Sequence, residues 1–299
     1  MTISAKIIAD SINRQGVRIT TLELEYPRFI HAELMTHRVF SRNSASSRAI
    51  PVSKMLKTIT LNPAKPIHWG KNEAGMQANQ ELDTNAKIMA NALWDTAKIN
   101  AVKISDKMHQ TGVHKQIANR ITEPFQHMKV VVTSTEWNNW DWLRYHPDAQ
   151  PEIKSLAEKT IEARANSSPV MLSSGEWHMP YVKTVVNEKL GLQYFDENDN
   201  VISAQEAIMI SASCCAQTSY RKSDTSLEKA EMIYKRLIES EPCHASPVEH
   251  QALAPDFDDE THAWPEGITH IDRDGNFWSG NFRSWIQYRQ LVPNNSKKG

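Results

Sequence analysis

Glycine, cysteine and long hydrophobic runs are scarce in this chain of 299 residues. It has 10 glycines and neither a G-x-G-x-x-G pattern nor a Walker A loop, which excludes the simplest Gly-rich nucleotide sites. Its three cysteines, Cys214, Cys215 and Cys243, form no C-x-x-C pair and no even set, so we expect a reducing, cytoplasmic environment. No run reaches about 18 apolar residues, and the stretch from Met1 to Lys6 lacks a signal-peptide layout. We therefore expect no membrane span and no leader.

An excess of charge of either sign is also missing. The chain has 34 Lys and Arg against 35 Asp and Glu, a net charge of -1. This balance argues against a nucleic-acid coat or a membrane-surface protein, but it allows a local basic pocket for one phosphate. The hydrophobic content of 40% is that of a globular protein, and the length fits two domains or one elaborated domain.

Hydrophobic spacing predicts an α+β fold with more helix than strand. Strands are expected at residues 17–25 and 129–133. Helices are expected at 29–36, 73–108, 114–121, 136–145, 151–165, 204–213 and 281–291. Another helix should follow a capping box formed by Thr225 and Glu228. Residues 61–72 and 255–275 are typical of loops, and 166–201 is typical of an insertion or a small flap.

Arginines and hydroxyl groups gather just after the first predicted helix. The run is Thr36-His37-Arg38-Val39-Phe40-Ser41-Arg42-Asn43-Ser44-Ala45-Ser46-Ser47-Arg48. Arginine forks and serine hydroxyls suit an anionic ligand such as phosphate. The same composition is also typical of a solvated, serine-rich loop with ordinary helix caps.

Two further stretches carry polar groups that suit a nucleotide. Arg120 stands before Pro124, where a lone arginine usually complements a helix end. The segment from Trp137 to Arg144 has three tryptophans, which more often pack in cores or interfaces. Its Asn139 and Arg144, with Gln150 beyond, are alternatively suited to a planar heterocycle.

The stretch Cys243-His244-Ala245-Ser246-Pro247-Val248-Glu249-His250 raises the alternative of a metal or a nucleophilic cysteine. Its spacing matches no common zinc pattern, and no second ligand cluster lies nearby in the sequence. A buried free cysteine is the commoner outcome for such a residue.

Together these stretches resemble the flavin-dependent thymidylate synthases, the ThyX family. That family has an Arg-His-Arg motif followed by a spaced Ser and Arg, which residues 36–48 resemble. The segments 120–133 and 139–153 resemble the family's central part, and 244–250 resembles its His-x-Thr-Pro-Phe-Glu-His stretch. Residues 216–220 are similar to its Ala-Arg-x-Ser-Phe element.

The order of these motifs differs from that of the family, where the last two elements precede the Arg-His-Arg motif. The resemblance therefore implies a circular permutation, with residues 281–291 as a partial copy of the helix before the motif. It implies one domain over residues 1–299, with insertions near 166–205 and 254–280. The fold it implies is a central mixed or antiparallel sheet flanked by long helices.

The resemblance implies methylation of dUMP at C5, with FAD as cofactor and NADPH and methylenetetrahydrofolate as co-substrates. Arg144 would stabilise charge on the pyrimidine. The other nucleotide contacts it implies are Glu33, Ser46, Ser47, Arg48 and Arg120. Those to FAD are His37, Arg38, Asn43, Asn139, Ser219, Ser246 and Glu249, while His244 would lie near the folate or nicotinamide. Family members are homotetramers whose sites combine several subunits, and the resemblance implies neither a nucleic-acid nor a membrane partner.

Several positions depart from the family pattern. Thr36 replaces the first arginine of the motif, a loss that Gln287 or Arg289 would offset. Glu33 replaces a glutamine, and an ionised carboxylate only accepts hydrogen bonds. Together with Ser44 and Ala49, which replace an acidic and an aromatic residue, it leaves dCMP or a hydroxymethylated product as alternatives. A non-catalytic nucleotide-binding protein and a Cys-His metal enzyme are the alternatives from other classes.

Overall fold

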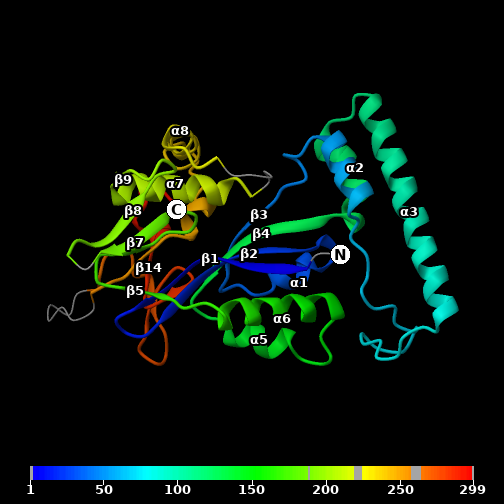
Figure 1. Ribbon diagram of the computed structural model, residues 1–299, viewed down its shortest axis with the longest axis horizontal. Helices are drawn as coiled ribbons and strands as arrows, with labels where there is room; N and C mark the ends of the chain where they lie inside the picture. The colour runs from blue at the N-terminus through cyan, green and yellow to red at the C-terminus, as the bar shows by residue number, and fades with distance from the viewer. Residues whose placement is uncertain (1–2, 188, 219–223, 257–263, 298–299) are drawn as a thin grey trace.

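A five-stranded sheet forms the centre of the protein (Figure 1). The computed structural model describes residues 3–187, 189–218, 224–256 and 264–297. The strand order is β3-β4-β2-β1-β5, with bounds Ser41–Ser44, His127–Ser134, Arg18–Pro27, Ser4–Asn13 and Val170–Leu172. Neighbours are antiparallel except β1 and β5, which are parallel. The predicted mixed or antiparallel sheet is confirmed, as are the two predicted strands within β2 and β4.

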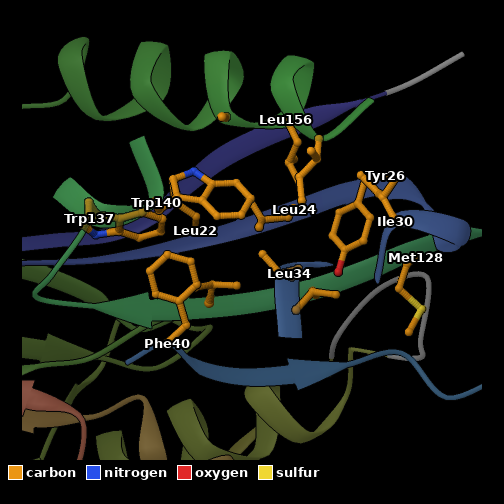
Figure 2. Close-up of a cluster of buried hydrophobic side chains, with 14 residues drawn as sticks. Leu22, Leu24, Tyr26, Ile30, Leu34, Phe40, Met128, Trp137, Trp140 and Leu156 are labelled. Atoms are coloured by element: carbon orange, nitrogen blue, oxygen red, sulfur yellow. The ribbon is translucent and has the colours of Figure 1, made fainter. Parts of the chain in front are cut away.

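Helices α5 (Asn138–Arg144) and α6 (Pro151–Ala165) cover one face of this sheet (Figure 1). Alternate residues of a strand point to the same face, so Leu22 and Leu24 of β2 both pack beneath these helices. Trp140 of α5 and Phe40, which precedes β3, complete this buried cluster (Figure 2). Both helices were predicted, and α6 has the predicted bounds because a proline favours the first helical position.

The C-terminal half covers the opposite face (Figure 1). Its helices are α7 (Ala204–Ala216) and α8 (Leu227–Leu237), with the short 3-10 helices η3 (Ser246–Glu249) and η4 (Tyr288–Leu291). Strands β6 (Trp177–His178), β10 (Ala252–Leu253) and β14 (Ile286–Gln287) form one small sheet. Two further three-stranded sheets contain β7 (Lys183–Asn187), β8 (Gly191–Phe195), β9 (Val201–Ile202), β11 (His270–Ile271), β12 (Phe277–Ser279) and β13 (Phe282–Arg283).

A helical block stands at the other end of the central sheet (Figure 1). It contains α2 (Val52–Leu61), α3 (Thr84–Gln110), α4 (Lys115–Ala118) and the 3-10 helix η2 (Asn119–Phe125). Helix α2 was not predicted, although Val52, Met55 and Ile59 lie on its buried face at helical spacing. The short segment at the front of the central sheet, η1 (Arg28–Ile30) with α1 (His31–Met35), agrees with the helix predicted at 29–36.

The predicted start of the long helix at residue 73 is wrong. Gly75 has φ +100°, which no α-helix accommodates, and Gly70 pairs with Glu81 in a bridge that folds this segment back on itself. The helix begins only after Asp83, whose side chain accepts a hydrogen bond from the backbone of Ala86 at 2.9 Å. Its end at Gln110 agrees with the predicted stop at Gly112.

The helix predicted at 281–291 is also wrong. Positive φ angles at Gly280 (57°) and Ser284 (56°) interrupt this segment. Trp285 and Ile286 are buried, and β14 pairs with β10. The apolar residues that have helical spacing in the sequence therefore lie in a strand and a 3-10 helix.

The predicted capping box at Thr225 is not formed. Ser226 caps α8 by accepting from the backbone of Lys229, whereas a capping box does join Ser203 and Glu206 at the start of α7. In the predicted loop 255–275, residues 257–263 lie outside the described part, and β11 is the strand found in the remainder. Across the residues that the structure describes, no helix is long and apolar enough to cross a membrane.

Candidate functional site

Arg144 is held against the end of α1 by three acceptors. Its Nε donates to His37 Nε2 at 2.9 Å. Its Nη2 donates to Thr36 Oγ1 at 3.0 Å and to the backbone oxygen of Glu33 at 3.3 Å. Within the described part of the chain, Nη1 makes no hydrogen bond to the protein. Three residues predicted for the site, Glu33, His37 and Arg144, are thus brought together with Thr36, and Arg144 is oriented with one nitrogen left to bind a ligand.

His37 is a neutral acceptor in this arrangement. Burial, with the positive charges of Arg144 and Arg42, lowers the pKa of His37 to about 4. Its ring stacks on Phe40 with centroids 5.6 Å apart and meets Trp140 edge to face at 4.9 Å. These rings fix the imidazole, which in turn fixes the guanidinium.

Glu33 carries a buried carboxylate oxygen, Oε2, that has no hydrogen-bond partner among the described residues. A buried oxygen without a donor is costly, so such groups are rare outside functional sites. Glu33 lies one helical turn before His37, on the segment that Arg144 contacts. Its side chain is thus suited to accept from a ligand N–H.

The predicted phosphate residues form a second group around the turn after β3. Asn119 donates from Nδ2 to the backbone oxygens of Ser47 (2.8 Å) and Ile50 (2.9 Å), which ties this turn to η2. Arg120 and Ser47 both reach Glu123 Oε1, at 3.4 and 3.5 Å. Ser46 lies in the same turn, and Arg48 is exposed there. Among the described residues, no hydrogen bond or ion pair joins Ser47, Arg120 or Glu123 to Arg144.

Arg28 and Glu123 belong to this second group and were not predicted. Arg28 Nη2 lies 2.9 Å from Glu123 Oε1 and forms an ion pair with it. Two arginines and a serine therefore converge on one carboxylate oxygen, an arrangement of donors that is suited to an anion. The sequence signal for Arg28 was weak, because it merely follows Pro27 at the end of a strand.

The predicted flavin residues bring β3, η3 and the C-terminal segment together. Asn43 is buried and donates to the backbone oxygen of Cys215 at 3.1 Å, which joins β3 to α7. Gln287 Nε2 donates to Ser41 Oγ at 3.0 Å and to the backbone oxygen of Glu249 at 3.1 Å. Arg289 forms an ion pair with the Glu249 carboxylate. Both suggested substitutes for the arginine missing at Thr36 thus lie beside Glu249.

Several predicted residues are exposed around these groups. Arg38 follows His37, Asn139 is the second residue of α5, Ser246 begins η3, and His244 precedes it. Ser219 lies outside the described residues. Of the three tryptophans, Trp137 and Trp140 are in the core, while Trp142 is 73% exposed.

The alternative of a metal site has no support in the described part of the chain. No three side chains of His, Cys, Asp or Glu come close enough there to share an ion. Cys214 and Cys215 are free and buried, and Cys243 is free and half-buried. Burial raises the pKa of the Cys243 thiol, which makes it a poorer nucleophile.

A row of hydrogen bonds, which the sequence analysis did not predict, runs across β1, β2 and β4 to His250, the residue after η3. His250 Nδ1 bonds with Thr133 Oγ1 (2.8 Å), which bonds with Thr21 Oγ1 (2.7 Å). Thr21 bonds with His178 Nε2 (2.8 Å), and His178 Nδ1 with Ser11 Oγ (2.9 Å). Burial lowers the pKa of both histidines to about 3, so each is neutral. His178 bonds through both ring nitrogens, whereas His250 bonds through Nδ1 and its buried Nε2 has no partner among the described residues.

Comparison with known proteins identifies the class. The sequence profile of the family described as "Thymidylate synthase complementing protein" matches residues 18–170, which contain β2, α1, β3 and the Arg144 segment. The chain belongs to this family. No curated protein sequence matches the chain.

Two solved structures are similar, both of the UMP/dUMP methylase PolB from Streptomyces cacaoi. The structure bound with 5-Br dUMP has a TM-score of 0.46 and the one bound with 5-Br UMP 0.47. Each shares 16% sequence identity and covers 57% of this chain and 91% of the other.

Proposed function

We propose that this protein methylates C5 of dUMP to give dTMP, with FAD as cofactor and methylenetetrahydrofolate and NADPH as co-substrates. Membership of the family supports this reaction, and the single observation that carries it is the orientation of Arg144. Bound FAD would carry a hydride from NADPH to the new carbon at C5. The protein's own residues then have three tasks, which are to bind the phosphate, to stabilise charge on the pyrimidine and to hold the flavin.

Ser46, Ser47, Arg48 and Arg120 would bind the phosphate of dUMP. In support, Arg120 and Ser47 already converge on a carboxylate oxygen of Glu123. A phosphate offers arginine and serine donors several charged oxygens, where Glu123 offers them a single one. The nucleotide would therefore compete with Glu123 for these donors.

Arg144 would stabilise the negative charge that develops on the pyrimidine carbonyl edge when C5 reacts. Three acceptors, one on α1 and two directly after it, hold its guanidinium in place before the substrate binds. A donor that is already oriented costs no reorganisation during the reaction, and this is the main source of electrostatic catalysis. No protein nucleophile is required.

The residues proposed for FAD fit an anionic, planar cofactor. Arg38 is exposed beside His37. Arg289 is a second cation in this region and forms an ion pair with Glu249. His37, Asn43, Asn139, Ser246 and Glu249 lie on the segments around β3, η3 and the start of α5. Ser219 and His244 remain proposed contacts to FAD and to the folate or nicotinamide, respectively.

A different pyrimidine nucleotide, such as dCMP, is the second candidate substrate. The observation that favours it is the buried Oε2 of Glu33, which has no partner among the described residues. A carboxylate there would accept from the exocyclic amino group of cytosine, whereas the family's glutamine also donates. Offering dCMP beside dUMP in the assay separates the two substrates.

The permuted order of the motifs is part of the proposal. Segments 41–44 and 246–249 lie far apart in the sequence, yet η3 packs against β3 and Gln287 bonds to both. This packing supports a single domain over residues 1–299 in which the late segments complete the flavin site.

The absorbance spectrum of the purified protein, with and without dUMP, tests the proposal. We expect flavin bands, present on purification or after addition of FAD, which shift when dUMP binds. A colourless protein that binds no added FAD would instead support a non-catalytic nucleotide-binding protein.

A further inference from the structure

A cavity of about 500 Å³ lies where the helical block meets the start of α6. One wall is the folded-back segment that contains Pro66, His68 and Asn79, and another is the connection from Pro147 to Glu152. In Figure 1 the cyan segment before α3 lies beside this end of α6. The volume is within the range of small-molecule sites, about 300–1,000 Å³. None of the residues proposed for dUMP or FAD lines it.

Glu152 places a carboxylate in this cavity that is only 2% exposed. Its Oε1 accepts from the backbone N–H of Ile67 at 2.8 Å, and its Oε2 accepts from Gln150 Nε2 at 3.0 Å. A carboxylate offers about four acceptor positions, so about two remain. No Lys, Arg or His among the described residues forms an ion pair with Glu152. A buried carboxylate without a cation is costly unless further donors reach it.

The other walls suit a flat ring. Phe29 and Trp94 line the cavity and meet edge to face, with centroids 6.2 Å apart. The indole N–H of Trp94 is already donated to the backbone oxygen of Ala64 at 3.0 Å, so its ring offers only apolar contact here. The lining contains no Lys or Arg, which disfavours an anion.

The amide side chains in the lining are suited to a neutral polar ligand. Gln77, Asn79 and Gln150 supply donors and acceptors around the carboxylate. His68 is occupied elsewhere, because its Nε2 bonds with the backbone oxygen of Ala78 at 2.8 Å. Recognition would therefore combine ring packing with hydrogen bonds to Glu152 and these amides.

We propose that this cavity binds an uncharged, planar nitrogen heterocycle that carries an amino group next to a ring N–H. The two N–H groups donate to the two oxygens of Glu152, and the ring packs on Phe29 and Trp94. Pterins and guanine nucleosides share this pattern of donors. The site is separate from the proposed dUMP and flavin contacts, and binding requires neither of those ligands.

Calorimetric titration of the full-length protein tests this site. The probes are pterin and guanosine, each compared with its analogue that lacks the amino group, lumazine and inosine. We expect at least one probe to bind about tenfold or more tightly than its analogue, since losing a hydrogen bond to a buried charge has an effect of that order. The tighter of the two probes identifies the source of the ligand.

Two variants and one control locate the binding. Glu152→Gln should weaken the preferred probe about tenfold or more, and Glu158→Gln, an exposed glutamate on the same helix, should leave it unchanged. Should Glu152→Gln fail to fold, Asn79→Trp fills the cavity from its rim with Glu152 intact and should abolish binding. Methylguanidine, a small cation with adjacent N–H donors, tests whether the cavity prefers a charged ligand. The proposal is overturned if neither probe binds, if the analogues bind equally well, or if methylguanidine binds more tightly than both probes. It is also overturned if neither cavity variant weakens binding.

Discussion

Arg144 and His37 depend on each other, although 107 positions separate them in the sequence. The imidazole accepts from the guanidinium only while it is neutral, and burial keeps it so by lowering its pKa to about 4. Thr36, which replaces a family arginine, accepts from the same guanidinium. The departure at Thr36 therefore removes one cation but adds a third anchor for Arg144.

Replacing Arg144 by lysine should lower kcat about 100- to 1,000-fold, the range for loss of one oriented donor in a charge-stabilising site. A lysine cannot reach His37, Thr36 and the substrate from one planar group. KM for dUMP and the melting temperature should change little. Arg236→Lys, an exposed arginine on α8, is the matched control. A kcat within threefold of the wild type would remove Arg144 from the mechanism.

His37 should also make stability depend on pH. Its pKa is about 4 in the folded chain against an ordinary value of 6.5, so the unfolded chain binds more protons between these values. Stability from this residue is complete above about pH 6.5 and is lost as the pH falls toward 4. Urea midpoints at pH 7 and 5 should therefore differ less for His37→Asn than for the wild type. Equal differences would contradict a neutral, buried His37.

At the scale of the elements, hydroxyl groups on β1, β2 and β4 join the sheet to the C-terminal half. Thr21 and Thr133 are register partners, and their side chains reach His178 of β6 and His250 after η3. Thr21, Thr133 and His178 each make two hydrogen bonds in the row, and His250 is bound to it through Nδ1, so the row fixes the position of η3, which carries Glu249. The flavin segment is thus held in place by polar contacts as well as by apolar packing.

Thr21→Val should destabilise the protein by about 1–3 kcal/mol, because it keeps the shape but leaves His178 without one of its buried partners. Thr96→Val, on the exposed face of α3, should stay within about 0.5 kcal/mol. Denaturant unfolding of both variants measures the difference. Equal stabilities would show that the row contributes nothing to docking the two halves.

Local signals predicted elements well where no distant partner decides the structure. Pro151 and helical spacing gave the bounds of α6, and Gly112 marked the end of α3. The helix predicted at 281–291 was wrong because non-local pairing decides this segment: β14 bonds to β10, and Trp285 is buried. In the candidate site, the family resemblance singled out Arg144 and Ser47, and their roles stay predictions. Arg28 and Glu123 were missed because their roles arise only from the packing of η1 against η2.

At the scale of the whole molecule, the two groups of proposed dUMP contacts share no hydrogen bond between Arg144 and Arg120 within the described residues. Arg144 ends α5 and bonds to the residues at the end of α1, and Arg120 lies in η2. The long helix α3 exposes Met89, Leu93 and Ile104 at 62%, 63% and 52%, as expected of a helix that meets another chain. We propose a homotetramer, as the resemblance implies, in which one site takes Arg144 and Arg120 from different chains.

Co-expressing Arg144→Ala with Arg120→Ala should restore activity that each variant lacks alone, because some sites then combine both wild-type arginines from different chains. Arg144→Ala co-expressed with the double variant cannot form such a site and should remain inactive. Activity is measured as dTMP formed, with the assembly's mass from light scattering. A tetramer without restored activity would place both arginines in one chain's site.

The most direct test of the proposed function is the product formed from dUMP, methylenetetrahydrofolate and NADPH by the FAD-loaded protein. The account predicts dTMP from the wild type and far less from Arg144→Lys under the same conditions. Absence of dTMP, with dCMP consumed or a hydroxymethylated nucleotide formed instead, would contradict it.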